Sequence, residues 1–517
     1  MDHRRPATTV APGPETDPVD QHRGGRGPAP PRRAVRALAR DERVFLAWLV
    51  IGLVGRVVAA RSSWGATDSD EATGMLMASR AAHGQLFNLF WGGNYGGTLS
   101  TWIDAPFVRV FGLHVAVFRV TNITFLLVAT VLLRVVAGKL VSRRAAVAAA
   151  VVFWVAPAAW VRWSMHEYVF WVPGICVALG AVLCSLRWNE CRRDRRLWPI
   201  GLLAGAAFWL YLPLWALIAP AVLAVAWIVR RRMVSLLKLV ALAPLGALPW
   251  LYTSATDNFG TLKRTPTGAE PVGHRLVHTV TQVLPTSLVD ATGLHLSAGL
   301  TAVIGIVIFG SVIGFVVRQA RRRRWLLALA GTPMVLWPCI IAASGVGTSA
   351  ASFRYGFLLV PVLALLLAYL ADQLRVSMVV PVLAAAVTAL GGAQVTGGWA
   401  RAPAYDPDLR VVSSFLLTQH RPHVYAGYWV SYVLSVASDR RVTASPTGTV
   451  RDLHYQDLAA AAPQATFVFQ AGLGLDQQMT AWTETHHVGH RVALGGYAVW
   501  ELPGPLPPGS IPLAGDF

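Results

Sequence analysis

Charged residues are scarce in this sequence, and those present are mostly of one sign. Only 14% of the 517 residues are charged, with 26 acidic against 45 basic side chains, while 54% are hydrophobic. The mean hydropathy is +0.49. Soluble globular domains carry about 25% charged residues. The composition therefore excludes an ordinary soluble protein and indicates a chain that crosses a membrane several times.

Cysteine is rare as well. Cys176, Cys184 and Cys339 lie in apolar runs and Cys191 in a basic turn, and their spacing fits neither a metal site nor a redox pair. The sequence also lacks an internal repeat of fixed period. On the side that carries the arginine clusters it has no glycine loop followed by a helix, the arrangement that cradles nucleotide phosphates.

The net charge of +19 does not indicate nucleic-acid binding, because the arginines do not gather on a soluble face. They form short clusters between apolar runs, at Arg143–Arg144, Arg192–Arg196, Arg230–Arg232 and Arg321–Arg324. Clusters of this kind mark the cytoplasmic ends of membrane helices. No nucleic-acid partner is predicted; membrane lipids are.

Long apolar runs predict the fold class: an α-helical polytopic membrane protein with about 11 transmembrane helices and a small C-terminal α/β domain. The runs lie near 44–60, 114–137, 145–160, 171–186, 197–211, 213–229, 234–252, 298–317, 325–343, 355–371 and 376–396. Drawn this way, every second connection contains an arginine cluster. The topology that follows places the N-terminus in the cytoplasm and the loops 61–113, 161–170, 254–297 and 344–353 outside.

Three domains are expected in this multi-pass protein of the cell membrane. Residues 1–43 are rich in Pro, Gly and Arg and predict a disordered cytoplasmic tail, followed by a first span that acts as an uncleaved anchor. Residues 44–396 form the transmembrane domain. In 397–517, short strands alternate with helices, which predicts an extracytoplasmic α/β domain. We expect strands at 423–425, 441–444, 466–469 and 497–502, with helices at 428–438, 455–462 and 476–485.

The first outer loop concentrates the polar groups. Asp68, Asp70 and Glu71 fall within four positions, and an amphipathic helix on the membrane surface is expected at 72–82. The alternative for the acids is a helix start, with Asp68 as the cap and Glu71 completing a capping box. Farther along the loop, Trp91, Asn94 and Tyr95 are residues suited to stack on and hydrogen-bond a sugar, which favours a binding site.

The second outer loop offers further candidates. Glu167 could orient an acceptor or ligate a metal, and His166 could assist; the alternative is an aromatic belt at the membrane interface with an Arg162–Glu167 pair. His486, His487 and His490 in the C-terminal domain lack cysteine or carboxylate ligands at a fitting spacing. No metal site is predicted there.

The order of several short motifs resembles a known family. They are Asp70-Glu71-Ala72 after the first helix, Gly74–Ala78, Gly92–Gly97, Ala105-Pro106, Arg56 at the outer end of the first helix, and Phe353–Gly356 before Pro361. Over residues 44–396 the chain resembles the GT-C class of membrane glycosyltransferases. The nearest group is glycosyltransferase family 39-like, related to protein O-mannosyltransferases and lipid A aminoarabinose transferases.

The resemblance implies that Asp70 is the catalytic base, with Glu71 beside it. It also favours Arg354, next to Tyr355, as the group that binds the donor phosphate, rather than an arginine reaching for lipid headgroups. Lys263 and Arg264 are alternative cations, and Arg56 is expected to be either a structural arginine or one that reaches for lipid headgroups. Relatives often carry Gln and Tyr where this chain has Asn94 and Tyr95, so the donor or acceptor preference is expected to differ.

These observations predict an inverting membrane glycosyltransferase with an Asp base. It would move a hexosyl or pentosyl group from a polyprenyl-phosphate donor to an envelope glycan, lipid or protein on the outer face. A phosphate leaving group needs little protonation, so one carboxylate and fixed positive charge suffice. No cofactor is certain, and a divalent cation stays open. The alternatives are a transporter or lipid flippase without transferase activity, and a non-catalytic assembly protein.

Overall fold

The computed structural model describes residues 32–93, 95–257, 271–292, 297–344, 356–396, 402–507 and 509–513. The chain divides between Val44 and Phe45, inside the first helix, and the description below concerns the unit from Phe45 onward. Some of the residues singled out above lie outside the described ones: residues 1–31 of the tail, Asn94, Lys263, Arg264, Arg354 and Tyr355.

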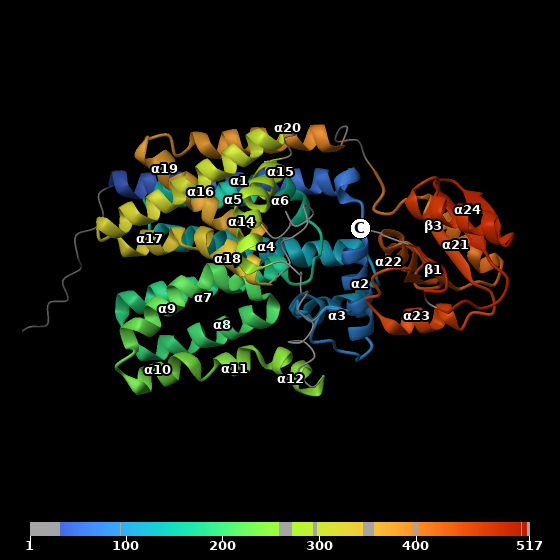
Figure 1. Ribbon diagram of the computed structural model, residues 1–517. Coiled ribbons are helices and arrows are strands. Elements are labelled where there is room, and N and C mark those ends of the chain that lie inside the picture. Colours follow the sequence, from blue (N-terminus) through green and yellow to red (C-terminus); the bar gives the residue numbers. More distant parts are fainter. Residues whose placement is uncertain are drawn as a thin grey trace, which may run out of the picture. The chain divides into compact units, whose positions relative to one another are not determined.

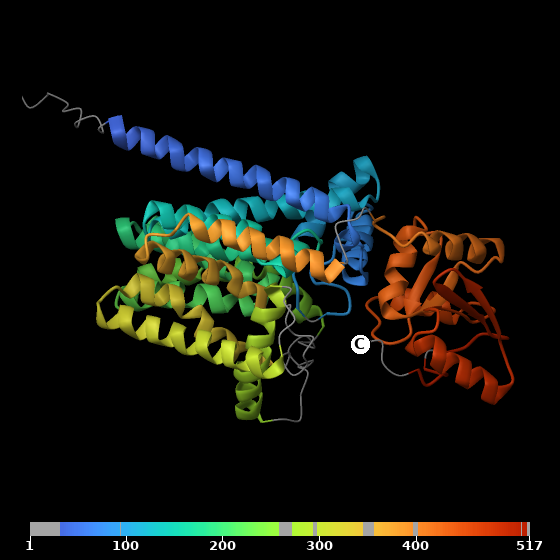
Figure 2. The same ribbon diagram turned by 90° about the horizontal axis from the view of Figure 1, so that it is seen from above.

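Helices make up almost all of the chain up to residue 396. Their bounds are α1 (Arg32–Ala60), η1 (Ser63–Gly65), α2 (Ser69–Ala81), α3 (Leu99–Phe111), α4 (Val115–Gly138), α5 (Arg143–Val155), α6 (Ala158–Trp163), α7 (Trp171–Cys191), η2 (Asp194–Arg196), α8 (Leu197–Leu210), η3 (Leu212–Leu214), α9 (Trp215–Val229), α10 (Met233–Val240), α11 (Ala243–Gly246), α12 (Leu248–Thr256), α14 (Val272–His278), η4 (Thr279–Val283), α15 (Leu284–Thr292), α16 (Ala298–Arg321), α17 (Trp325–Gly331), α18 (Pro333–Ser344), α19 (Val360–Gln373) and α20 (Val379–Thr396). Helix α1 thus takes in the end of the segment expected to be disordered. Figures 1 and 2 show the long helices side by side with nearly parallel axes.

The membrane-spanning character of this bundle is confirmed. Among the described residues, seven segments are long and apolar enough to cross a membrane: 40–60, 115–138, 171–191, 212–229, 299–321, 325–343 and 356–373. The helix pair 233–246 and 248–256, bent by 58°, counts as an eighth if its two helices together form one broken span. The remaining predicted runs fold as α5, α8 and α20, which are not among these spans.

A five-stranded sheet follows, with the helices α21 (Asp408–Thr418), α22 (Tyr428–Ala437), α23 (Leu453–Ala460) and α24 (Gly474–His486) packed against it. The strands are β1 (His423–Ala426), β2 (Thr443–Pro446), β3 (Thr466–Gln470), β4 (His490–Leu494) and β5 (Tyr497–Glu501). Their order is β2-β1-β3-β5-β4. Strands β2, β1 and β3 pair in parallel, and the hairpin β4–β5 joins β3 antiparallel. The predicted C-terminal α/β fold is confirmed; α21 and β4 were not predicted.

Helix α2 differs from its prediction. An amphipathic helix at the membrane surface would leave one face exposed, yet eleven of the thirteen residues of α2 are buried. The helix packs against α3 on one side and against α22 of the C-terminal part on another. Its alanine, glycine and serine residues are small enough for neighbours to approach from several directions. The prediction of a surface helix was therefore wrong.

Helix α8 approaches its neighbours through glycines. A Cβ atom on Gly205 would lie 1.9 Å from the carbonyl oxygen of Ala243, and one on Gly201 would lie 2.0 Å from that of Leu239. These two glycines are four residues apart on one helical face, the spacing that lets membrane helices pack backbone to backbone. Because these glycines have no side chains, the backbones of α10 and α11 can pack directly against α8.

Gly205→Ala should therefore destabilise the protein, because the added methyl group cannot fit without moving α11. Overpacking of this kind costs about 1–3 kcal/mol. Thermal unfolding of the detergent-solubilised protein should show a lower midpoint for this variant. The matched control is Gly314→Ala in α16, where an added Cβ meets no atom within 4 Å. Equal midpoints for the two variants would contradict the close packing of α8 and α11.

Candidate active site

Asp70 lies in the first turn of α2, where two groups from the C-terminal part reach it. Its Oδ1 accepts a hydrogen bond from the Tyr428 hydroxyl and lies 3.4 Å from Nη2 of Arg451. Nε of Arg451 in turn donates to the Tyr428 hydroxyl at 3.0 Å. The Asp70 side chain is 15% exposed, so its carboxylate is oriented by these partners and is still reachable.

A small cavity opens beside this carboxylate. It has a volume of about 50 Å³ and is lined by Asp70, Phe90, Gly93, Tyr95, Tyr168, Phe170, Trp171 and Arg451. Ligand pockets usually measure about 300–1,000 Å³, so this one holds a few water molecules but no sugar ring. Its walls are aromatic, with one carboxylate and one guanidinium facing the space.

The two predicted aromatic candidates lie in different places. Tyr95 lines the cavity and is 39% exposed. Trp91 is only 6% exposed, with the Arg80 guanidinium 4.7 Å from its ring centroid and Phe87 in edge contact at 5.4 Å. Arg80 also forms a 2.7 Å ion pair with Asp452. The structure thus brings Tyr95, but not Trp91, to the carboxylate.

Gly92 explains how the aromatic loop meets the C-terminal part. It has φ +64°, and a Cβ atom there would lie 2.9 Å from Cα of Arg451 and 2.9 Å from the carbonyl oxygen of Val450. Only glycine permits both the left-handed backbone and this approach. The loop and the segment that carries Arg451 therefore touch backbone to backbone.

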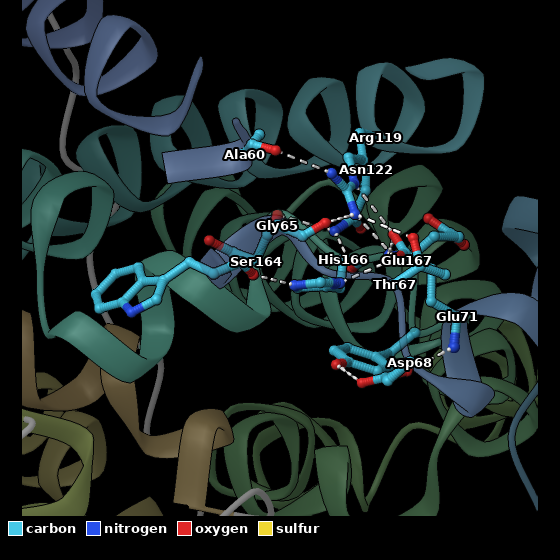
Figure 3. Close-up of polar contacts among 12 residues, drawn as sticks. Ala60, Gly65, Thr67, Asp68, Glu71, Arg119, Asn122, Ser164, His166 and Glu167 are labelled. Carbon is cyan, nitrogen blue, oxygen red and sulfur yellow. Dashed lines mark hydrogen bonds and ion pairs between the residues drawn. The ribbon is translucent and has the colours of Figure 1, made fainter. Parts of the chain in front are cut away.

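Glu71 does not line the cavity, and Figure 3 shows its contacts in a buried ion cluster. Its carboxylate lies 3.1 Å from Nη2 of Arg119 in α4 and 3.0 Å from Nδ1 of His166. Nη2 of Arg119 also donates to the Gly65 carbonyl at 2.7 Å. Glu71 is fully buried. Its carboxylate joins the first outer loop, α4 and the second outer loop, instead of capping α2 as the alternative interpretation proposed.

His166 lies between two oxygen atoms from different segments. Its Nε2 is 2.8 Å from the carbonyl oxygen of Trp64, and its Nδ1 is 3.0 Å from the Glu71 carboxylate. Burial alone would raise the pKa of Glu71, but His166 and Arg119 together hold that pKa well below its usual value.

Two more buried acidic residues, Asp104 and Glu167, lie near this cluster. Asp104 in α3 and Glu167 are both fully buried, and their carboxyl oxygens have no hydrogen-bond partner of ordinary geometry. Burial raises the pKa of Asp104 to about 7. Burial, and then Asp104 itself, raise the pKa of Glu167 well above its usual value. At least one of the two is therefore protonated at neutral pH, since two unpaired charges would be too costly to bury together.

Asp68 is the N-cap of α2, as its position predicted. Its Oδ1 accepts from the backbone N–H of Glu71 at 2.9 Å, and its Oδ2 accepts from the Tyr168 hydroxyl at 2.5 Å. Burial raises the pKa of Asp68. The acid thus positions the first turn of α2, and with it Asp70.

Other candidates have structural contacts. Arg56 is buried, with its guanidinium 4.3 Å from the Trp154 ring centroid and 3.2 Å from Oγ of Ser164, which agrees with its expected structural role. Arg162 is exposed whereas Glu167 is buried, so the expected Arg162–Glu167 pair does not form. In the C-terminal part, His486 stacks on Trp482 at 4.3 Å and His490 lies 3.7 Å from Glu501.

Three residues of the site were missed. Arg119 lies within the apolar run 114–137, which also contains Arg134, and an ionisable residue in such a run is itself a signal of a buried partner. Tyr428 and Arg451 gave no signal, because nothing local distinguishes them from other aromatic and basic residues of the C-terminal part. Only the fold brings them to Asp70.

Comparisons with known proteins bear on the fold. No protein-family model matches the sequence, and no curated protein is similar to it. The oligosaccharyltransferase of Archaeoglobus fulgidus, solved with Zn and sulfate, superposes with a TM-score of 0.51 at 12% identity, over 84% of this chain and 69% of that chain. The chain has a GT-C fold. The predicted resemblance to GT-C membrane glycosyltransferases is thus confirmed at the level of the fold.

A second neighbour is ArnT from Cupriavidus metallidurans. Its structure bound to undecaprenyl phosphate gives a TM-score of 0.47 at 13% identity. Its apo structure gives 0.49 at 14% identity. Both alignments cover 92% of this chain and all of ArnT.

Substitution of Glu71 should lower the stability of the folded protein. Glu71→Gln leaves the buried Arg119 guanidinium and the His166 ring without their counter-charge, and breaking a buried ion pair costs about 3–5 kcal/mol. The expected result is a large fall in folded yield and in the thermal midpoint. Asp70→Asn, one residue away, should leave both nearly unchanged.

A double-mutant cycle supplies the control for this prediction. Combining Glu71→Gln with Arg119→Gln removes both charges, so the double variant should be more stable than the sum of the single effects predicts. Strictly additive losses would contradict the buried pair.

Asp104 should make stability depend on pH. An unfolded Asp has a pKa near 3.9, whereas that of Asp104 is raised to about 7 in the folded chain. The folded state therefore loses stability as pH rises between these values. The Asp104→Asn variant has no carboxyl group to ionise at this position. As pH rises from 5 to 8, the thermal midpoint of the wild type should therefore fall by several degrees relative to that of the variant. A difference that stays constant with pH would contradict the raised pKa.

Proposed function

We propose that this chain is a membrane glycosyltransferase that moves a sugar from a polyprenyl-phosphate donor to an acceptor on the outer face. The observation that carries the proposal is the Asp70 carboxylate, oriented by Tyr428 and adjacent to Arg451 at an aromatic-lined cavity. The GT-C fold supports the proposal, since the Archaeoglobus fulgidus neighbour is an oligosaccharyltransferase.

Asp70 rather than Glu71 is the proposed base. A base must touch the hydroxyl group from which it takes a proton, and Asp70 lines the cavity. Glu71 is fully buried, and its charge is already balanced by Arg119 and His166. In this scheme Glu71 positions α2, and Asp70 accepts the proton of the acceptor hydroxyl as that oxygen attacks the anomeric carbon.

Arg451 is the described cation best placed for the donor phosphate. A guanidinium binds phosphate with two parallel hydrogen bonds, and Arg451 lies next to the base in the same cavity. When the donor enters, its phosphate would compete with Asp70 for this side chain, which frees the carboxylate to act as a base. Arg354 and Tyr355 remain part of the proposal as further donor-binding residues, as does Asn94 toward the sugar.

The proposed reaction inverts the configuration at the anomeric carbon. The acceptor oxygen bonds to that carbon while the bond to the phosphate oxygen breaks, Asp70 takes the proton, and the phosphate leaves with the bond's electron pair. Arg451 would stabilise the charge that develops on the phosphate. Tyr95 would supply a ring face for the sugar. Glu167 and His166 would not touch the substrate; they would position Glu71, whose carboxylate contacts His166 Nδ1 and the Glu167 backbone N–H.

A divalent cation is a further part of the proposal, because the Archaeoglobus fulgidus protein was solved with Zn. Over the part of this chain that the structure describes, no three His, Cys, Asp or Glu side chains gather in a way that could hold a metal ion. The described side chains alone therefore do not fit a metal, and no step above is routed through one.

The topology belongs to the proposal as well. The N-terminus would be cytoplasmic, and Asp70, Arg451 and the whole C-terminal domain 397–517 would face outward. Nucleotide sugars are cytoplasmic, so a site on the outer face would use a sugar delivered on a membrane lipid. Acceptors of fitting chemistry are an envelope glycan, a lipid or a protein.

Asp70→Asn should lower sugar transfer by about 100-fold or more while the protein stays folded and membrane-inserted, since a positioned base contributes about 10²–10⁴ in rate. Arg451→Ala should impair donor binding, and Arg451→Lys should restore part of it. The measurement is mass spectrometry of lipid-linked sugars and envelope glycans in cells that carry each variant.

Asp439→Asn, an exposed acid of the C-terminal part, is the control for this prediction. Wild-type transfer by Asp70→Asn would reject the base. If cells without the protein do not accumulate a polyprenyl-phosphate sugar, the transferase hypothesis is rejected. That result would favour the alternative hypothesis of a transporter or flippase.

A further inference from the structure

A second cavity in the described part of the chain is an apolar groove that Asp70 does not line. It has a volume of about 1030 Å³ and is lined by residues of α4, α7, α9, α17 and α19, the helices labelled in Figure 1. We call it the α9–α17 groove. Leucine, alanine and valine line most of it, among them Leu133, Leu179, Leu217 and Leu365. Its size is at the upper end of the range for ligand pockets, about 300–1,000 Å³.

The polar lining of the groove gathers at one end. Arg323 and Arg324 of the α16–α17 turn, Lys139 and Asn189 supply it. Lys139 is balanced by Glu190, whose carboxylate lies 2.7 Å from its Nζ. Arg323 and Arg324 are exposed, and among the described residues no carboxylate lies within ion-pair distance of either. The groove thus combines an apolar interior with two unbalanced positive charges at its rim.

This charged end lies at the opposite end of helix α7 from the cavity beside Asp70. Helix α7 connects the two sites, because Trp171 at its start lines the cavity beside Asp70 and Asn189 near its end lines the groove. Eighteen residues of helix separate them, about 27 Å at the usual rise. That is close to the thickness of the hydrocarbon core. A donor whose phosphate reaches Asp70 cannot place the same phosphate at Arg323 and Arg324.

We propose that the α9–α17 groove binds an anionic diacyl phospholipid of the cytoplasmic leaflet. The acyl chains would fill the apolar interior, and the headgroup phosphate would contact Arg323 and Arg324. Basic pockets between membrane helices attract anionic headgroups in this way. The occupant would hold α17 against α9, two elements that touch directly only over a short stretch.

Binding to the full-length protein in detergent tests this proposal without any activity measurement. Native mass spectrometry and thermal unfolding would compare dioleoyl phosphatidylglycerol, dioleoyl phosphatidylcholine, undecaprenyl phosphate and inorganic phosphate. Phosphatidylglycerol should be retained and raise the thermal midpoint. The double substitution R323Q/R324Q should weaken its binding at least tenfold, whereas R321Q/R322Q, in the same turn but outside the groove, should not.

A second variant tests the apolar interior. Ala224→Phe fills part of the groove and should reduce phosphatidylglycerol retention with both arginines intact. The proposal is overturned if phosphatidylcholine binds equally well, if inorganic phosphate alone gives the same protection, or if R321Q/R322Q weakens binding as much as R323Q/R324Q. Preferential retention of undecaprenyl phosphate would assign the groove to the carrier lipid and would also overturn it. None of these outcomes depends on Asp70.

Discussion

The buried pairing of Glu71 with Arg119 and His166 is the interaction on which the rest of the site depends. It ties the start of α2 to α4 and to the second outer loop. Successive residues of a helix point roughly 100° apart. Once Glu71 is fixed inward, Asp70 has to project sideways, toward the cavity. A buried ion pair contributes little net stability. In this protein it fixes the orientation of Glu71, which determines the direction in which the neighbouring Asp70 side chain points.

The site is composite. The membrane part supplies the carboxylate of Asp70 and the aromatic wall, while the C-terminal part supplies Tyr428 and Arg451. The backbone contact at Gly92 and the ion pair between Arg80 and Asp452 hold the two together. A C-terminal domain that only recognised an acceptor would not need to reach the carboxylate. Its contacts orient the Asp70 carboxylate directly.

The sequence predicted those features that local physics determines. Apolar runs became helices because membrane helices satisfy their own backbone hydrogen bonds, and Asp68 became a cap because its side chain reaches the free N–H groups of the first turn. Burial of α2 could not be predicted, since it depends on α22, more than 350 residues away. The same holds for Arg451. Asp104 and Arg119 stand in mostly apolar segments, and nothing in those segments indicates which buried group each side chain will meet.

The distance along the chain between Asp70 and Arg451 also has a consequence for how the protein is made. Polypeptides emerge from the ribosome N-terminal part first, and their domains generally fold as they appear. The bundle would enter the membrane with Asp70 in place well before Tyr428 and Arg451 have been synthesised. A nascent chain would therefore carry the Asp70 carboxylate without Tyr428 and Arg451 until the segment that contains them has been made. The orientation of that carboxylate would be set during synthesis of the C-terminal part and not when the bundle enters the membrane.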